Sequence, residues 1–110
     1  MAARYKISID AGATFQVQFE YTNPDGSLFD LTGYTAKMQI RETVEGPLVK
    51  EIFPLIDVET ATVSVELSAE ETAELTAPEY VYAIEIYAPD QGPTIRLVEG
   101  GIDVSPEVVR

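Results

Sequence analysis

The chain has 110 residues, of which 45% are hydrophobic, so it can form one modest core and is too short for two. Seven basic residues stand against nineteen acidic ones, and the resulting formal charge of −12 would repel a nucleic-acid backbone. The absence of cysteine and histidine excludes disulfides, zinc–thiolate sites and the usual general base. We therefore expect one domain over residues 1–110 that binds no nucleic acid.

The N-terminal segment, MAARYKISID, lacks the apolar stretch of a secretion signal. No apolar run in the chain approaches the length that spans a membrane. We expect a soluble product of the cytoplasm, without membrane insertion.

Short segments of alternating apolar and polar residues begin the chain. Residues 4–9 and 15–21 both have a period of two, which is typical of half-buried strands. The DAG between them, at residues 10–12, is too short for a crossover helix and predicts a tight corner between two sheets. Next, NPDG at residues 23–26 predicts a turn, as does DLTG at residues 30–33, where Asp30 or Thr32 binds backbone N–H groups and Gly33 takes a positive φ.

A third strand, at residues 36–41, has two different faces. Its apolar positions, which we expect to enter the core, are Ala36, Met38 and Ile40. Lys37, Gln39 and Arg41 would then form an outward row in a protein that is short of positive charge. This row is a candidate docking surface for an acidic neighbour, and ordinary solvent exposure is the alternative.

The middle of the chain predicts two more strands and one helix. Residues 48–53 form a fourth strand that ends at Pro54, and residues 62–67 form a fifth. Ser68 followed by Glu71 is the pattern of a capping box, which predicts a helix over about 68–75 that stops before Pro78.

The last two strands complete the predicted fold. Residues 80–88 form a strongly apolar sixth strand, in which Tyr80 or Tyr82 could make a tyrosine corner. A PDQG turn leads into residues 94–104, where the facing shifts by one residue and predicts a bulge at Gly100 and Gly101. Together these elements predict an all-β fold: an antiparallel immunoglobulin-like β-sandwich of about seven strands, with one short helix between the fifth and sixth.

Candidate chemical groups each have a structural explanation. Acidic residues at 70, 71 and 74 suit the start of a helix better than acid–base catalysis. Those at 25, 30 and 57 suit turns, and no calcium-loop pattern surrounds them. Without histidine, no serine or threonine has a conventional activating base. We expect no catalytic residue, metal site or cofactor, and therefore no enzyme.

Six segments of the chain are specific in combination, and in order they are DLTGYTAKMQIR, LSAEETAEL, YVYAIEI, PDQG, IRLVEG and VSPEVVR. This series resembles a family of small proteins encoded by tailed bacteriophages and prophages. The resemblance extends from about Phe15 to Arg110. Two positions depart from the pattern: Ala83 stands where Asp usually follows YVY, and Val109 where Thr usually precedes the final Arg.

The resemblance implies a β-sandwich virion component, similar to the immunoglobulin-like N-terminal modules of baseplate and tail-fibre proteins. The expected partners are other phage virion proteins, met in multiple copies within a symmetric assembly, so the chain would be found in the virion and, before assembly, in the host cytoplasm. The exposed tail with Pro106, Val108 and Arg110 is a second candidate docking surface, since an extended segment can add to a neighbour's sheet edge. The alternatives are a capsid decoration or cement protein and a receptor- or glycan-binding module that uses tyrosines.

Overall fold

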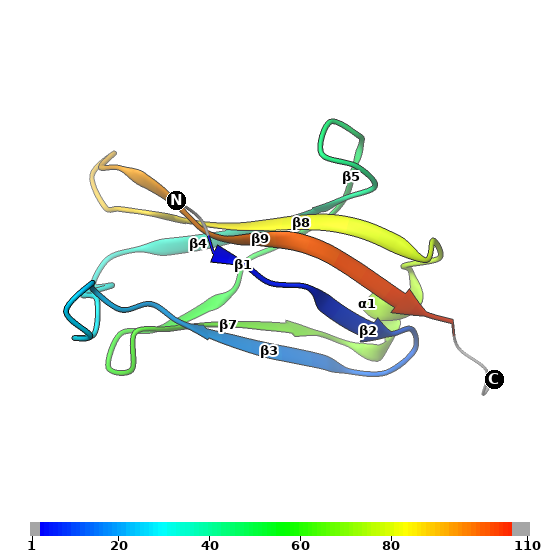
Figure 1. The fold of residues 1–110 in the computed structure, drawn as a ribbon, viewed down its shortest axis with the longest axis horizontal. Helices are drawn as coiled ribbons and strands as arrows, with labels where there is room; N and C mark the ends of the chain where they lie inside the picture. Colours follow the sequence, from blue (N-terminus) through cyan, green and yellow to red (C-terminus); the bar gives the residue numbers. More distant parts are fainter. Residues whose placement is uncertain (1–2, 107–110) are drawn as a thin grey trace.

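The computed structural model describes residues 3–106 as two packed β-sheets with a short helix at one end (Figure 1). The strands are β1 (Ala3–Arg4), β2 (Ile7–Asp10), β3 (Phe15–Glu20), β4 (Thr35–Arg41), β5 (Leu48–Ile52), β6 (Leu55–Asp57), β7 (Thr62–Leu67), β8 (Glu79–Tyr87) and β9 (Thr94–Ser105). The helix is α1 (Ala69–Ala73). The prediction of a mostly β protein with one short helix is confirmed.

The two sheets divide the strands unequally. Sheet A has the order β1-β9-β8-β4-β5, with β2 also paired to β9, and sheet B has the order β3-β7-β6. The corner at residues 10–12 carries the chain from sheet A to sheet B, as predicted. Sheet A is mixed, because β1 and β2 run parallel to β9.

The prediction of a purely antiparallel sandwich was therefore wrong for the first strands. β2 and β9 end side by side, where the backbone N–H of Ala11 donates to the carbonyl oxygen of Ser105 at 2.9 Å. Alternation with a period of two is the same for parallel and antiparallel neighbours, so the pattern carried no information about direction.

The strand count also differs from the prediction of about seven. The first predicted strand is broken after Arg4, and β6 is a short strand that starts directly after Pro54. At the break, the backbone of Tyr5 lies against Gly100, and its carbonyl oxygen accepts a hydrogen bond from the Tyr82 hydroxyl at 2.6 Å. The Tyr5 N–H still donates to the Glu99 carbonyl of β9, whereas the Tyr5 carbonyl makes a tertiary contact that no local sequence pattern indicates.

The helix begins as the sequence predicts. The Ser68 side chain accepts from the Glu71 backbone N–H at 3.1 Å, and the Glu71 carboxylate accepts from the Ser68 N–H at 3.0 Å. Lys50 on β5 forms ion pairs with Glu71 and Glu74 at 3.1 and 3.5 Å, which tie the helix to the edge of sheet A. These contacts give Glu71 and Glu74 a structural role.

The predicted bulge in β9 lies elsewhere. The pairing of β8 with β9 shifts where Ile84 pairs with Val98 and Glu85 pairs with Arg96, which leaves Leu97 as the extra residue. Both Leu97 and Val98 are buried, so the bulge places two consecutive apolar side chains out of solvent. The glycine at position 100 has a different purpose, because a Cβ there would collide with the backbone of Tyr5.

The core lies between the sheets and is almost entirely apolar. Its fully buried members include Met38, Ile40, Ile84 and Ile102. Thr72 is the one buried polar residue in the described part of the chain; its hydroxyl donates to the Ala13 carbonyl and accepts from the Gly12 N–H. Among residues 3–106 no helix has the length and apolar character needed to cross a membrane.

Candidate functional site

The outward row of β4 faces a groove on the outer side of sheet A. Lys37, Gln39 and Arg41 alternate with buried residues as predicted, but they are half-buried instead of fully exposed. The reason is that the groove, with a volume of about 650 Å³, has walls formed by other segments. Its lining residues are Arg4, Lys37, Gln39, Arg41, Val44, Val81, Tyr82, Ala83, Glu85, Tyr87, Arg96, Glu99, Gly100 and Gly101.

Register explains the shape of this groove. Gln39 pairs with Ala83 across β4 and β8, and Ala83 pairs with Glu99 across β8 and β9, so these positions share one face. Small residues at 83, 100 and 101 make a low floor between longer side chains. The loop between β4 and β5 rises above the outer face of sheet A and carries Val44, whose side chain is 81% exposed (Figure 1).

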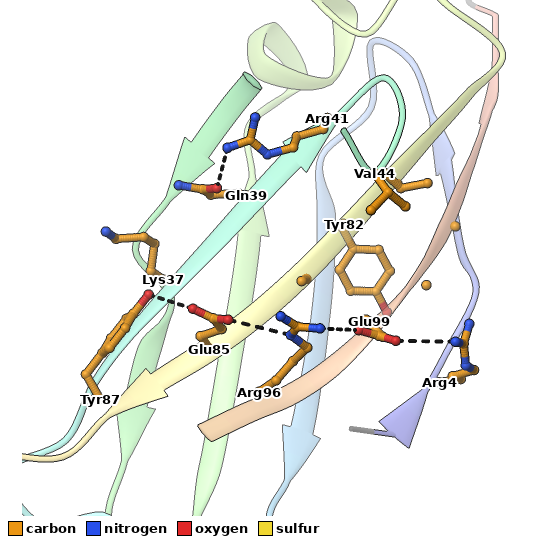
Figure 2. Close-up of a pocket in the computed structure, with 14 residues that line it drawn as sticks. Arg4, Lys37, Gln39, Arg41, Val44, Tyr82, Glu85, Tyr87, Arg96 and Glu99 are labelled. Carbon is orange, nitrogen blue, oxygen red and sulfur yellow. Dashed lines mark hydrogen bonds and ion pairs between the residues drawn. The ribbon is translucent and has the colours of Figure 1, made fainter. Parts of the chain in front are cut away.

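A chain of charged contacts crosses one side of the groove (Figure 2). The Tyr87 hydroxyl donates to Glu85 at 3.0 Å, and Glu85 lies 3.5 Å from the Nε of Arg96. Arg96 then contacts Glu99 at 3.2 Å, and Glu99 contacts Arg4 at 3.4 Å. Burial raises the pKa of Tyr87, and the hydrogen bond to Glu85 adds to this effect because it favours the neutral phenol.

The cations of β4 are held in a different way. The Lys37 ammonium lies over the ring of Tyr87, 5.6 Å from its centre. Arg41 donates to the side-chain oxygen of Gln39 and to the Gly46 carbonyl, both at 3.0 Å, while Gln39 donates to Glu51 at 2.7 Å. Within residues 3–106, neither Lys37 nor Arg41 has a carboxylate partner.

The charge of the groove is opposite to that of the whole protein. Four of the seven basic residues line it, but only two of the nineteen acidic ones do. Four positive and two negative side chains give the lining a formal charge of +2, in a chain whose total is −12. Because Lys37 and Arg41 are positioned without being neutralised, the groove is suited to bind a negatively charged surface.

Only part of this site was predicted from the sequence. Of the residues that line the groove, Lys37, Gln39 and Arg41 were predicted, whereas the arginines and glutamates of β1, β8 and β9 were not. The one available signal was Glu85, which interrupts the apolar segment at residues 80–88. Pro106 is exposed after β9 and does not line the groove, while Val108 and Arg110 lie outside the described residues.

The other candidate groups have structural roles where the structure describes them. Asp25, Asp30 and Asp57 each accept a hydrogen bond from the backbone N–H two residues later, at 2.9 to 3.0 Å, so they cap turns. The carboxylates of Asp25 and Asp30 accept hydrogen bonds from the hydroxyl and the backbone N–H of Ser27 and Thr32, respectively, and these bonds lower the pKa of each carboxyl. Tyr80 and Tyr82 are buried, and the Tyr80 hydroxyl accepts from the Ala77 N–H at 2.9 Å.

Comparisons of the sequence with known proteins do not assign a function to this site. The chain matches no protein-family model, and no curated protein is similar enough in sequence to count as a relative.

Proposed function

We propose that the chain is a non-enzymatic structural subunit of a tailed-bacteriophage particle, in the tail or baseplate region, that docks an acidic protein neighbour through the groove on sheet A. The observation that carries the proposal is the charge of the groove: a lining of +2 in a chain of −12. The series of phage-like segments supports the setting, and the lack of histidine and cysteine supports a binding role over a catalytic one.

We also infer that the two sheets form a variant of the immunoglobulin sandwich. In that fold one sheet contains strands G, F, C and C′ and the other contains B, E and D. The orders β9-β8-β4-β5 and β3-β7-β6 correspond to these sets when the strands are counted along the chain. The bond from the Ala77 N–H to the Tyr80 hydroxyl supports the inference, because it resembles a tyrosine corner at the start of strand F.

The chemistry of the groove favours a protein neighbour over a glycan. Glycan binding in the groove would require open aromatic rings there, but of the two tyrosines that line it Tyr82 is in the core and the ring of Tyr87 lies beneath Lys37. Lys37 and Arg41 instead offer charge-assisted hydrogen bonds to carboxylates.

Cryo-electron microscopy of the intact particle tests the setting, and we expect density for this domain in the tail or baseplate, with the groove against an acidic surface. Lys37→Glu tests the groove and should reduce incorporation into particles. Lys6→Glu is the matched control: it makes the same charge change on an exposed lysine between β1 and β2, which pairs with Asp103 and does not line the groove. Density on the head lattice would favour a capsid decoration protein, and equal incorporation of both variants would contradict groove docking.

A further inference from the structure

The outer face of sheet B differs in charge from the groove. Three of the residues that alternate outward on its strands are acidic and none is basic: Gln16, Gln18, Glu20, Leu55, Asp57, Thr62, Ser64 and Glu66. A shallow depression of about 460 Å³ lies over part of this face, and neither lysine nor arginine lines it. The outer face of sheet B therefore has a formal charge of −3.

Two apolar side chains stand at the rim of this face. Phe53 is 67% exposed and Leu55 is 77% exposed, and both line the depression together with Glu66. Protein interfaces commonly combine large apolar side chains, which are buried on binding, with a surrounding rim of polar and charged groups. On the groove side, Val44 is a matching exposed apolar group at the wall.

We propose that the groove of one copy binds the outer face of sheet B of a second copy. This inference rests on the proposed function, and it names the acidic neighbour as the chain itself. Lys37 and Arg41 would meet Asp57 and Glu66 of the next copy, with Leu55 beside Val44. The charges are complementary, since a lining of +2 meets a face of −3.

The position of the two surfaces makes the contact intermolecular. They are on the outer sides of opposite sheets, so one copy cannot pair its own groove with its own sheet B (Figure 1). Because the surfaces differ, the contact is heterologous, and each bound pair still presents one open groove and one open face. Repetition then produces a ring or a stack, which is the kind of assembly expected of a repeated virion subunit.

Sedimentation velocity over a concentration series tests the proposal with the purified chain. Each copy carries a formal charge of −12, so the long-range repulsion between copies has to be screened before they can meet. We expect the sedimentation coefficient to rise with concentration at about 0.15 M salt and to fall again at about 1 M salt, where the charge pairs of the contact are screened as well. The groove variant Lys37→Glu/Arg41→Glu and the face variant Phe53→Ser/Leu55→Ser should each weaken association by about tenfold or more. Leu28→Ser is the matched control, since Leu28 is 46% exposed in the hairpin near residue 25 and belongs to neither surface.

Mixing the two variants distinguishes this contact from a symmetric dimer. The groove variant keeps an intact face and the face variant keeps an intact groove, so an equimolar mixture should form a one-to-one dimer and nothing larger. A wild-type chain that stays monomeric at about 0.15 M salt up to millimolar concentration overturns the proposal, and so does a mixture that forms no dimer.

Incorporation into particles separates this inference from the proposed function. If the groove variant is excluded while the face variant is incorporated like the wild type, self-stacking is wrong and docking to another virion protein stands. If the groove variant is incorporated normally, the proposed function itself fails.

Discussion

The two faces of β4 are made from alternating residues of a single strand, yet different interactions determine which residues occupy them. On the inner face, Met38 and Ile40 are 0% exposed, and burial alone accounts for their identity. On the outer face, Lys37 and Arg41 obtain their surroundings from other segments: the ring of Tyr87 on β8 and the carbonyl of Gly46 in the next loop. The residues of the inner face therefore follow from the period-two alternation of the strand itself, whereas the contacts of the outer face depend on how β4 aligns with neighbouring segments.

This difference separates stability from binding. A change on the inner face removes packing that the whole sandwich shares. A change on the outer face affects side chains that are partly solvated, where single surface pairs contribute little to folding. The two rows can therefore be altered independently, and the following experiments use that separation.

The largest expected effect is on the inner face. Met38→Ala should lower the free energy of unfolding by about 2–5 kcal/mol, because it leaves a cavity between the sheets. Its neighbour offers the matched comparison: Lys37→Ala should change the same quantity by less than about 0.5 kcal/mol. Urea unfolding followed by circular dichroism measures both. Similar losses for the two variants would show that the outer row also supports the fold.

A smaller effect is expected where Tyr5, just after β1, lies against Gly100 of β9. Gly100→Ala places a methyl group against the carbonyl of Tyr5 and should cost about 1–3 kcal/mol of unfolding free energy, with faster hydrogen exchange in β1. Gly101→Ala is the control, because its nearest neighbour would be the Tyr80 carbonyl oxygen at 3.8 Å. The same urea titration compares them, and equal stability of the two variants would refute the close approach.

The smallest expected effect concerns the hydroxyl of Tyr82. Tyr82→Phe removes its hydrogen bond to Tyr5 and should cost about 1 kcal/mol at neutral pH. Burial raises the pKa of Tyr82 from 10.0 to about 12. Because this raised pKa belongs to the folded state, the contribution of the neutral phenol is complete below pH 10.0 and is lost as pH rises toward about 12.

Urea unfolding at a series of alkaline pH values tests this last point. The wild type should lose stability between pH 10.0 and about 12 more steeply than Tyr82→Phe, which has no hydroxyl to ionise at that position. Parallel curves for the two proteins would mean that Tyr82 is not the group responsible.

Much of the fold could be predicted because its signals are local. The capping box at Ser68, the Asp30 turn with Gly33 at a φ of 79° and the alternation in β4 each depend on neighbours within a few residues. The inward and outward rows of β4 were also correct, since a period of two fixes facing.

Each feature that was predicted wrongly depends on contacts with residues far away in the sequence. The bulge at Leu97 depends on how β9 aligns with β8, and the break at Tyr5 depends on Gly100 nearly a hundred residues away along the chain. The candidate site was half found for the same reason: Lys37 belonged to a visible row, whereas Arg96 and Glu99 joined it only through strand pairing. Parallel and antiparallel strands show the same alternation of apolar and polar residues, so the parallel pairing of β2 with β9 could not be predicted from the sequence pattern.

The break between β1 and β2 has a consequence for aggregation. An unbroken edge strand presents a continuous row of backbone donors and acceptors to any other chain. Here that row is interrupted, because β1 ends at Arg4 and β2 begins at Ile7, so that Tyr5 and Lys6 belong to neither strand. Short edge segments on either side of a bend are poor templates for an added strand. This edge of sheet A is thus a poor site for another copy of the chain to extend the sheet.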